Sequence, residues 1–232
     1  HNGIISIRDV NNNYKLIKEF NSYGKGPHEI LLLNNKNIIV VANGGIKTHP
    51  KTARKKLNIH NMESNISFID FDNGKLLEQY KLKDQYQSIR HITVSKNNDV
   101  YFSTQYQSKI NDSKKIVGVV RSNKIELFDI ENKFLEKFKN YSGSVKFDEV
   151  NNLLVVSHPR GNRLSFWDAK KKVFIKTIKF SDVCGIAVNQ NKIFVSNGYG
   201  DLRKYYFYQK NFFTEYFQRK INLKWDNHME II

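Results

Sequence analysis

The sequence predicts an all-β protein, a β-propeller built from four-stranded antiparallel blades. Three observations support this fold class: one hairpin pattern recurs four times, the turns are rich in Asn, Asp and Lys, and apolar residues come in short runs without helical spacing. These runs fall short of the roughly 18 apolar residues that a membrane-spanning helix needs. A single cysteine, Cys184, allows no internal disulfide.

The repeated unit is an entry turn, an apolar alternation, a polar turn, a second apolar run and a polar exit. It occurs at residues 26–45, 88–107, 141–162 and 182–201. Aligning Ile30, Ile92, Val145 and Ile186 gives spacings of 62, 53 and 41 residues, of which the shortest is a normal blade length. We expect each unit to form the first two strands of a blade, joined by a tight hairpin turn.

The intervening segments have the pattern expected of the two outer strands. Residues 66–82, 117–138 and 164–180 each show a strand, a D-x-x-x-(G/K) turn and a second strand, and residues 4–20 show the same outer pair without an inner hairpin. The count is about four and a half blades in a single domain spanning residues 1–232. Propellers usually close with more blades, so we expect an incomplete ring whose first blades precede His1.

The net charge of +16 comes from 38 Lys and Arg against 22 Asp and Glu. It is compatible with a nucleic-acid partner, but the lysines are spread through every segment, which favours compositional drift. Basic clusters at residues 51–56 and 170–172 are typical of solvated loops. We therefore expect no nucleic acid and no membrane span among the partners.

Blade topology predicts where polar side chains converge. The first strand of a blade starts at one face and the second strand returns to it, so the starts of first strands and the ends of second strands share one rim. A polar concave rim is the usual ligand site of such a fold. The candidate ligand-binding residues there are His28, Glu29, His49, Arg54, Arg90, His91, Gln105, Gln107, Arg160, Asp182 and Cys184.

Each candidate also has a structural interpretation. The histidines at 28 and 91 could face the funnel or bond to a neighbouring blade's backbone, and the arginines at 90 and 160 could clamp an anion or tie blades together. Cys184 could be a small core residue, a nucleophile or a metal thiolate. The histidines are dispersed, so no metal site is assigned, the cofactor stays unknown, and no catalytic motif is found.

The rim motifs resemble those of the bacterial domain-of-unknown-function 1513 family. They are GPHEI, VANGGIKTHP, SIRH, YSGS, SHPRGN, DVCG, SNGYG and the terminal WDNH, and the resemblance runs from about residue 23 to 228. It implies an exported, periplasmic or similar location, because members often carry a signal sequence, and a link to iron acquisition, because their genes tend to lie beside imelysin-type genes. The sequence departs from the family pattern at His158, where serine is usual, and at Ser64 and Asn65, where Pro-Ser is usual.

Two functions follow from the rim. The first is a non-catalytic protein that binds a protein partner or a small ligand. The alternative is a metal-assisted, lactonase-like hydrolase or a redox enzyme that uses the same histidines. Rim acids are scarce, with only Glu29 and Asp182, which favours binding. Residues 46–63 form an inserted loop that we expect to cover the funnel, the alternative being an ordered structural flap.

Overall fold

The structure, a computed structural model, describes residues 3–34, 36–52, 55–108, 113–208, 211–219, 222–226 and 228–231. The chain divides into two compact units. The first comprises His1–Arg90 with Gln107–Lys109, and the second comprises His91–Tyr106 with Ile110–Ile232. That residues 1–232 form a single domain stays a prediction. No helix in the described ranges has the length and apolar character needed to cross a membrane.

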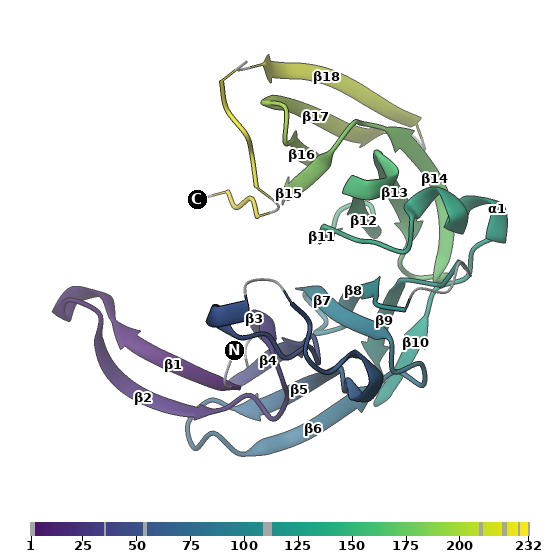
Figure 1. The fold of residues 1–232 in the computed structure, drawn as a ribbon. Coiled ribbons are helices and arrows are strands. Elements are labelled where there is room, and N and C mark those ends of the chain that lie inside the picture. Colours follow the sequence, from purple (N-terminus) through teal and green to yellow (C-terminus); the bar gives the residue numbers. More distant parts are fainter. Residues whose placement is uncertain are drawn as a thin grey trace. The chain divides into compact units, whose positions relative to one another are not determined.

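The first unit contains a two-stranded and a four-stranded antiparallel sheet (Figure 1). The pair is β1 (Ile4–Asp9) and β2 (Lys15–Asn21), which confirms an outer pair without an inner hairpin. The larger sheet runs in chain order through β3 (Pro27–Leu32), β4 (Ile38–Asn43), β5 (Asn65–Asp70) and β6 (Leu76–Lys81). The two sheets pack through an apolar cluster of Ile5, Ile39, Val41 and Ile69.

Three four-stranded sheets follow, and the boundary between the two units falls within the first strand of the first one, after Arg90. The first sheet contains β7 (Gln87–Val94), β8 (Val100–Tyr106), β9 (Val117–Arg121) and β10 (Lys124–Leu127). The second contains β11 (Ser144–Asp148), β12 (Leu153–His158), β13 (Arg163–Asp168) and β14 (Val173–Lys179). The third contains β15 (Val183–Asn189), β16 (Lys192–Asn197), β17 (Asp201–Tyr208) and β18 (Asn211–Arg219).

Strand β12 shows why the second strand of a blade is a continuous apolar run. All six of its residues are buried. Leu154 and Val156 enter one apolar cluster with Trp167, while Val155 enters another with Phe166. Side chains alternate between the two faces of a strand, so a sheet packed between two neighbouring sheets buries every position, and the polar residues at the end of this strand, Ser157 and His158, are buried as well.

The order of strands within the sheets agrees with the prediction. Strands β11 and β15 are the first strands of their sheets, and β11 packs against β15 and β8. Figure 1 shows β11 and β15 on the inner side of the second unit, with β14 and β18 outside. The segments beginning at residues 141 and 182 are therefore innermost, and the all-β propeller fold is confirmed.

The outer part of one blade differs from its predicted form. Residues 117–138 were expected to turn at the D-x-x-x-K motif, but the turn is at Ser122 and Asn123, whose φ values of 50° and 59° suit a two-residue hairpin. The motif instead leads into α1 (Asn132–Leu135) and the 3-10 turn η4 (Glu136–Phe138). Leu135 and Phe138 lie three residues apart and are both buried, as on one face of a helical turn.

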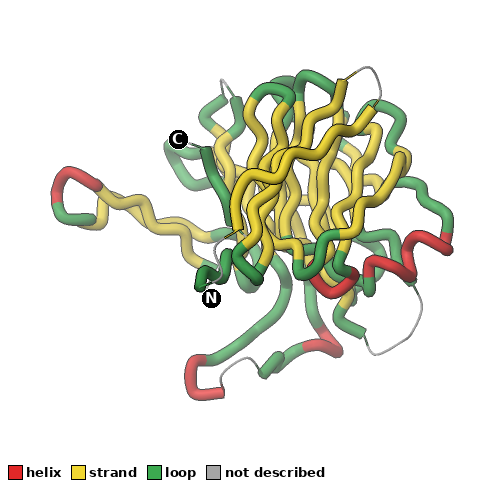
Figure 2. The backbone as a smooth tube through the Cα atoms, turned by 90° about the horizontal axis from the view of Figure 1, so that it is seen from above, coloured by secondary structure: helices red, strands yellow, loops and turns green. Residues whose placement is uncertain are grey.

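Three further 3-10 turns lie in loops: η1 (Val10–Asn12), η2 (Pro50–Thr52) and η3 (Ile59–Asn61), and a fourth, η5 (Pro159–Gly161), follows β12. In the loop 46–63, the described residues outside η2 and η3 have no regular structure. Figure 2 draws such loop backbone in green and helical turns in red. The prediction that this segment contributes no strand is confirmed for its described residues.

Candidate functional site

In the second unit, contacts between rim residues form a continuous series. The Gln105 side chain donates a hydrogen bond to the carbonyl of Ser142 at 3.0 Å, and Ser142 Oγ donates to the carbonyl of Thr104 at 2.8 Å. The guanidinium carbon of Arg160 lies 4.2 Å from the ring centroid of Tyr141, which pairs with Gln105 through a β-bridge. Blade topology thus brings Gln105 and Arg160 to one edge, where Arg160 is exposed.

His158, at the end of β12, is a buried structural residue in this rim. Its Nδ1 lies 3.1 Å from the carbonyl of Tyr141, so Nδ1 carries the proton and Nε2 accepts a hydrogen bond from Ser165 Oγ at 2.7 Å. Its ring stacks on Phe138 with centroids 4.0 Å apart. Burial lowers the pKa of His158 to about 3, against a smaller opposing effect of the Tyr141 carbonyl. A neutral imidazole held in this way has no acid–base role near pH 7.

Asp182 and Cys184 lie together at the start of β15. The Asp182 carbonyl accepts hydrogen bonds from the Gly198 amide at 3.1 Å and from Cys184 Sγ at 3.0 Å. The Cys184 carbonyl accepts from Ser157 Oγ of β12 at 2.7 Å, which joins two blades. Burial raises the pKa of Cys184 to about 11, and the carboxylates of Asp182 and Asp226 add to this effect. Cys184 is half-buried and lies outside the apolar clusters described above, so it is not the core residue of its structural interpretation. Its raised pKa also disfavours a reactive thiolate.

The first unit carries the other rim residues. His28 and Glu29 are half-buried on β3, next to Pro27, which pairs with Asn43. The Arg90 side chain packs on Gly44: a Cβ built at Gly44 would be in contact with Arg90 Nε, at 3.4 Å. His28 and Glu29 therefore lie at one end of this sheet, and Arg90 of β7 packs against the same end. That they line one cavity with the rim of the second unit stays a prediction.

The inserted loop is tied to the first unit by Asn58. The Asn58 side chain accepts a hydrogen bond from the Lys47 amide at 2.6 Å and donates one to the Gly45 carbonyl at 2.9 Å. Met62 is buried, whereas His49 is exposed. These contacts are those of an ordered flap.

Two other predicted ligand-binding residues, Gln107 and Arg54, lie near the loop or within it. Lys56 donates a hydrogen bond to the side-chain oxygen of Gln107, which joins the loop to the segment after β8. Arg54 lies outside the described residues. The role of the loop as a cover stays a prediction.

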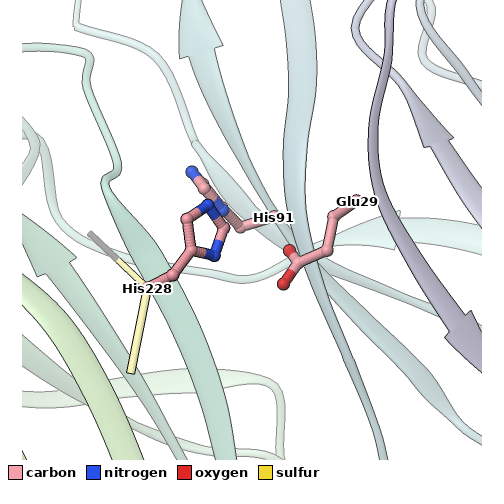
Figure 3. A group of neighbouring side chains, drawn as sticks. All are labelled: Glu29, His91 and His228. Carbon is pink, nitrogen blue, oxygen red and sulfur yellow. The ribbon is translucent and has the colours of Figure 1, made fainter. Parts of the chain in front are cut away.

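The C-terminal segment, meaning the described residues 222–226 and 228–231, brings further side chains to the inner strands of the second unit. Figure 1 shows it returning from β18 toward β15. Glu230 pairs with Lys146 of β11 at 2.5 Å, and the ring centroids of His228 and His91 are 5.5 Å apart (Figure 3). Sequence reasoning missed His228 as a site residue. The WDNH motif, which contains His228, pointed to this segment, but no local pattern in it predicts that it contacts β7.

The sequence analysis also does not predict a cavity in the second unit, at the ends of the blades opposite the rim. This cavity of about 470 Å³ is lined by hairpin turns, among them those carrying Asp99, Arg121, Glu149 and Lys170. Arg121 Nε pairs with Asp99 at 2.9 Å, and another Arg121 nitrogen donates to the Tyr101 hydroxyl at 2.8 Å. Burial raises the pKa of Tyr101 to about 12, partly offset by Arg121. Arg121 and Asp99 are therefore paired with each other, as expected of a structural contact.

Solved structures similar to this chain are β-propellers. The β-propeller domain of Myceliophteria thermophila Cps50 (Swd1) matches with a TM-score of 0.62 and 10% identity over 90% of this chain and 60% of that chain. A chain of the mitotic checkpoint complex matches with a TM-score of 0.68 and 9% identity over 99% of this chain and 62% of that chain. At such low identity the likeness shows the fold alone.

The chain spans about 60% of the length of each of these two matched chains. No curated protein matches it. The sequence model of the family described as "Protein of unknown function (DUF1513)" matches residues 1–232, so the chain belongs to the DUF1513 family.

Proposed function

We propose that this chain is a non-catalytic binding protein that captures an extended acidic segment of a protein partner on the inner strands of its blades. The observation that carries the proposal is the position of the chain's own C-terminal segment. Residues 223–226 and 228–231 have no helix or strand, yet they contact inner strands from three blades of the second unit. An extended peptide that lies on these strands is an example of the ligand that they accept.

Gly185 leaves space for a peptide backbone beside the inner strands. A Cβ at this position of β15 would lie 3.1 Å from the Asp226 carbonyl oxygen and 3.2 Å from the Met229 Cβ. Glycine therefore lets a peptide backbone approach the strand closely. A larger residue here would push a bound segment away.

Lys146 gives the site its preference for acidic side chains. Its side chain is 19% exposed, and its ammonium group meets the Glu230 carboxylate, whose side chain is 74% exposed. An ion pair with so exposed a partner is worth little, typically less than about 1 kcal/mol. The acidic side chain of a partner can therefore replace Glu230 at little cost.

Charge reversal at Lys146 tests the proposal. We expect the immobilised full chain to capture a partner from an extract of its native compartment, and we expect that purified partner to bind directly. K146E should abolish capture because the carboxylates would repel each other, whereas K146R should retain it. K170E, at the opposite end of the same blade, is the matched control and should bind normally. Capture by K146E at the wild-type level, with an unchanged melting temperature, would refute the proposal.

The cellular setting is proposed from family membership. We propose that the protein is exported and takes part in iron acquisition, as the resemblance of its motifs to the DUF1513 family implies. Fractionation of cells that express the native gene should place the protein outside the cytoplasm. Its abundance should rise on iron limitation, and equal abundance in iron-replete and iron-starved cells would contradict the link to iron.

A further inference from the structure

We propose that His91 and His228 bind a divalent transition-metal ion, and that this ion fastens the C-terminal segment to strand β7. The two histidines come from distant parts of the second unit. His91 lies on the first strand of a blade and is 2% exposed, whereas His228 is exposed and belongs to a segment without regular structure.

The geometry of the two imidazoles supports a shared ion. A ligand nitrogen of His91 and one of His228 lie within 4.8 Å of each other, and the rings are inclined by 55° (Figure 3). Two imidazole nitrogens on one tetrahedral ion, each about 2.0–2.1 Å from it, are about 3.3 Å apart. A small rotation of the exposed His228 side chain closes this difference, while the buried His91 stays in place.

The donor type selects the class of ion. Imidazole nitrogen suits zinc, nickel, cobalt and copper, whereas calcium and magnesium prefer oxygen donors. Two histidines leave further coordination positions, which water or a donor atom of a bound partner can fill. This site differs in chemistry from the Lys146 contact, so it does not depend on the acidic-peptide proposal.

Fastening follows from the positions of the two ligands. One ligand belongs to a strand within a sheet and the other to the C-terminal segment, so an ion that binds both favours the docked segment over the released one. The gain grows with metal concentration as mass action requires. Without the ion, the described part of the segment still has its contacts with β11 and β15.

Titration of the metal-free full chain with cobalt(II) tests the site, with binding followed by the visible absorption of the ion and by calorimetry. We expect one ion per chain and a loss of affinity of at least about tenfold in H228A, since even residues behind metal ligands affect affinity by about this much. His228 is exposed, so the variant should fold. H60A removes an exposed histidine of the inserted loop and should bind as the wild type does. Equal affinity of H228A and H60A would overturn the site.

Trypsin cleavage after the exposed Lys224 tests the fastening separately. Lys224 lies between β18 and His228. Cobalt should slow this cleavage at least about tenfold in the wild type and in H60A, and should not change it in H228A. Stoichiometric binding with unchanged cleavage of the wild type would show an ion site that does not fasten the segment, which would overturn the second half of the proposal.

Discussion

The imidazole of His158 occupies a fully buried position, stacked on Phe138 and bonded to Ser165 Oγ. Ser165 Oγ also accepts a hydrogen bond from Trp167 Nε1 at 2.8 Å. The three polar groups satisfy one another inside an apolar cluster, so they fix the end of β12 without exposing charge. The His158 ring reaches partners through both of its nitrogens.

The buried His158 should make stability depend on pH. Its folded pKa, about 3, is below the usual value of 6.5, so below pH 6.5 the unfolded state binds a proton that the folded state rejects. Stability from this group is complete above pH 6.5 and should fall by about 2 kcal/mol between pH 7 and pH 5.

Urea unfolding at several pH values measures this loss, and NMR follows the His158 ring, with H158Q identifying its resonances. A His158 ring that titrates between pH 6 and pH 7 would contradict the buried neutral state.

Two neighbouring glycines should respond differently to alanine. Gly45 has a φ of +75°, and a Cβ there would lie 2.6 Å from the backbone of Glu63 and Ser64. G45A should lower the free energy of unfolding by about 2–4 kcal/mol, because alanine disfavours the left-handed backbone conformation and its Cβ would clash with this backbone. At Gly44 the nearest atom, Ser88 Oγ, is 3.1 Å away, so G44A should cost less than half as much. Chemical denaturation of both variants measures the difference, and equal losses would contradict this account.

At the scale of elements, the outer strand pair, the inserted loop and the C-terminal segment depend on different contacts. Strands β1 and β2 are held by apolar packing on the next sheet. The loop is held by the Asn58 amide and by buried Met62. The C-terminal segment has weaker contacts, namely an ion pair whose Glu230 side chain is largely exposed and a pair of imidazole rings, which suits an element that a partner can displace.

Shortening the loop should separate its structural part from its proposed role as a cover. Replacing residues 48–57 by Gly-Ser keeps Asn58, so stability should change by less than about 1 kcal/mol. Replacing residues 48–60 removes the two Asn58 hydrogen bonds and should cost about 1–3 kcal/mol. Thermal melting compares the two deletions, and equal melting temperatures would show that Asn58 does not hold the loop.

Partner capture by the shorter deletion then tests the cover. If the loop covers the ligand, capture should weaken although the protein is folded. Capture at the wild-type level would leave the loop as a structural flap only.

At the scale of the whole molecule, the net charge of +16 should produce only nonspecific attraction to nucleic acid. We expect DNA binding to be independent of sequence and to fall steeply between about 50 mM and about 200 mM salt, because it comes from counterion release. Fluorescence anisotropy with two unrelated duplexes of equal length measures this. A tight complex that survives physiological salt, or a clear preference for one duplex, would contradict the prediction.

The sequence by itself determined the blades. Alternating apolar residues, polar turns and largely apolar second strands are local patterns, so they predicted β3, β7, β11 and β15 as first strands. Residues 117–138 show where local patterns fail: the D-x-x-x-K motif suits a turn as well as a short helix, and the burial of Leu135 and Phe138 selected the helix.

Only the tertiary structure decided which rim residues are structural and which side chains meet. The sequence placed Gln105, Arg160 and Cys184 at one edge, but burial lowered the pKa of His158 and raised that of the Cys184 thiol. The meeting of His228 with His91 was not predictable, because it joins a segment without local structural preference to a distant strand. Local sequence fixes backbone conformation over a few residues, whereas such a contact depends on how separate elements pack.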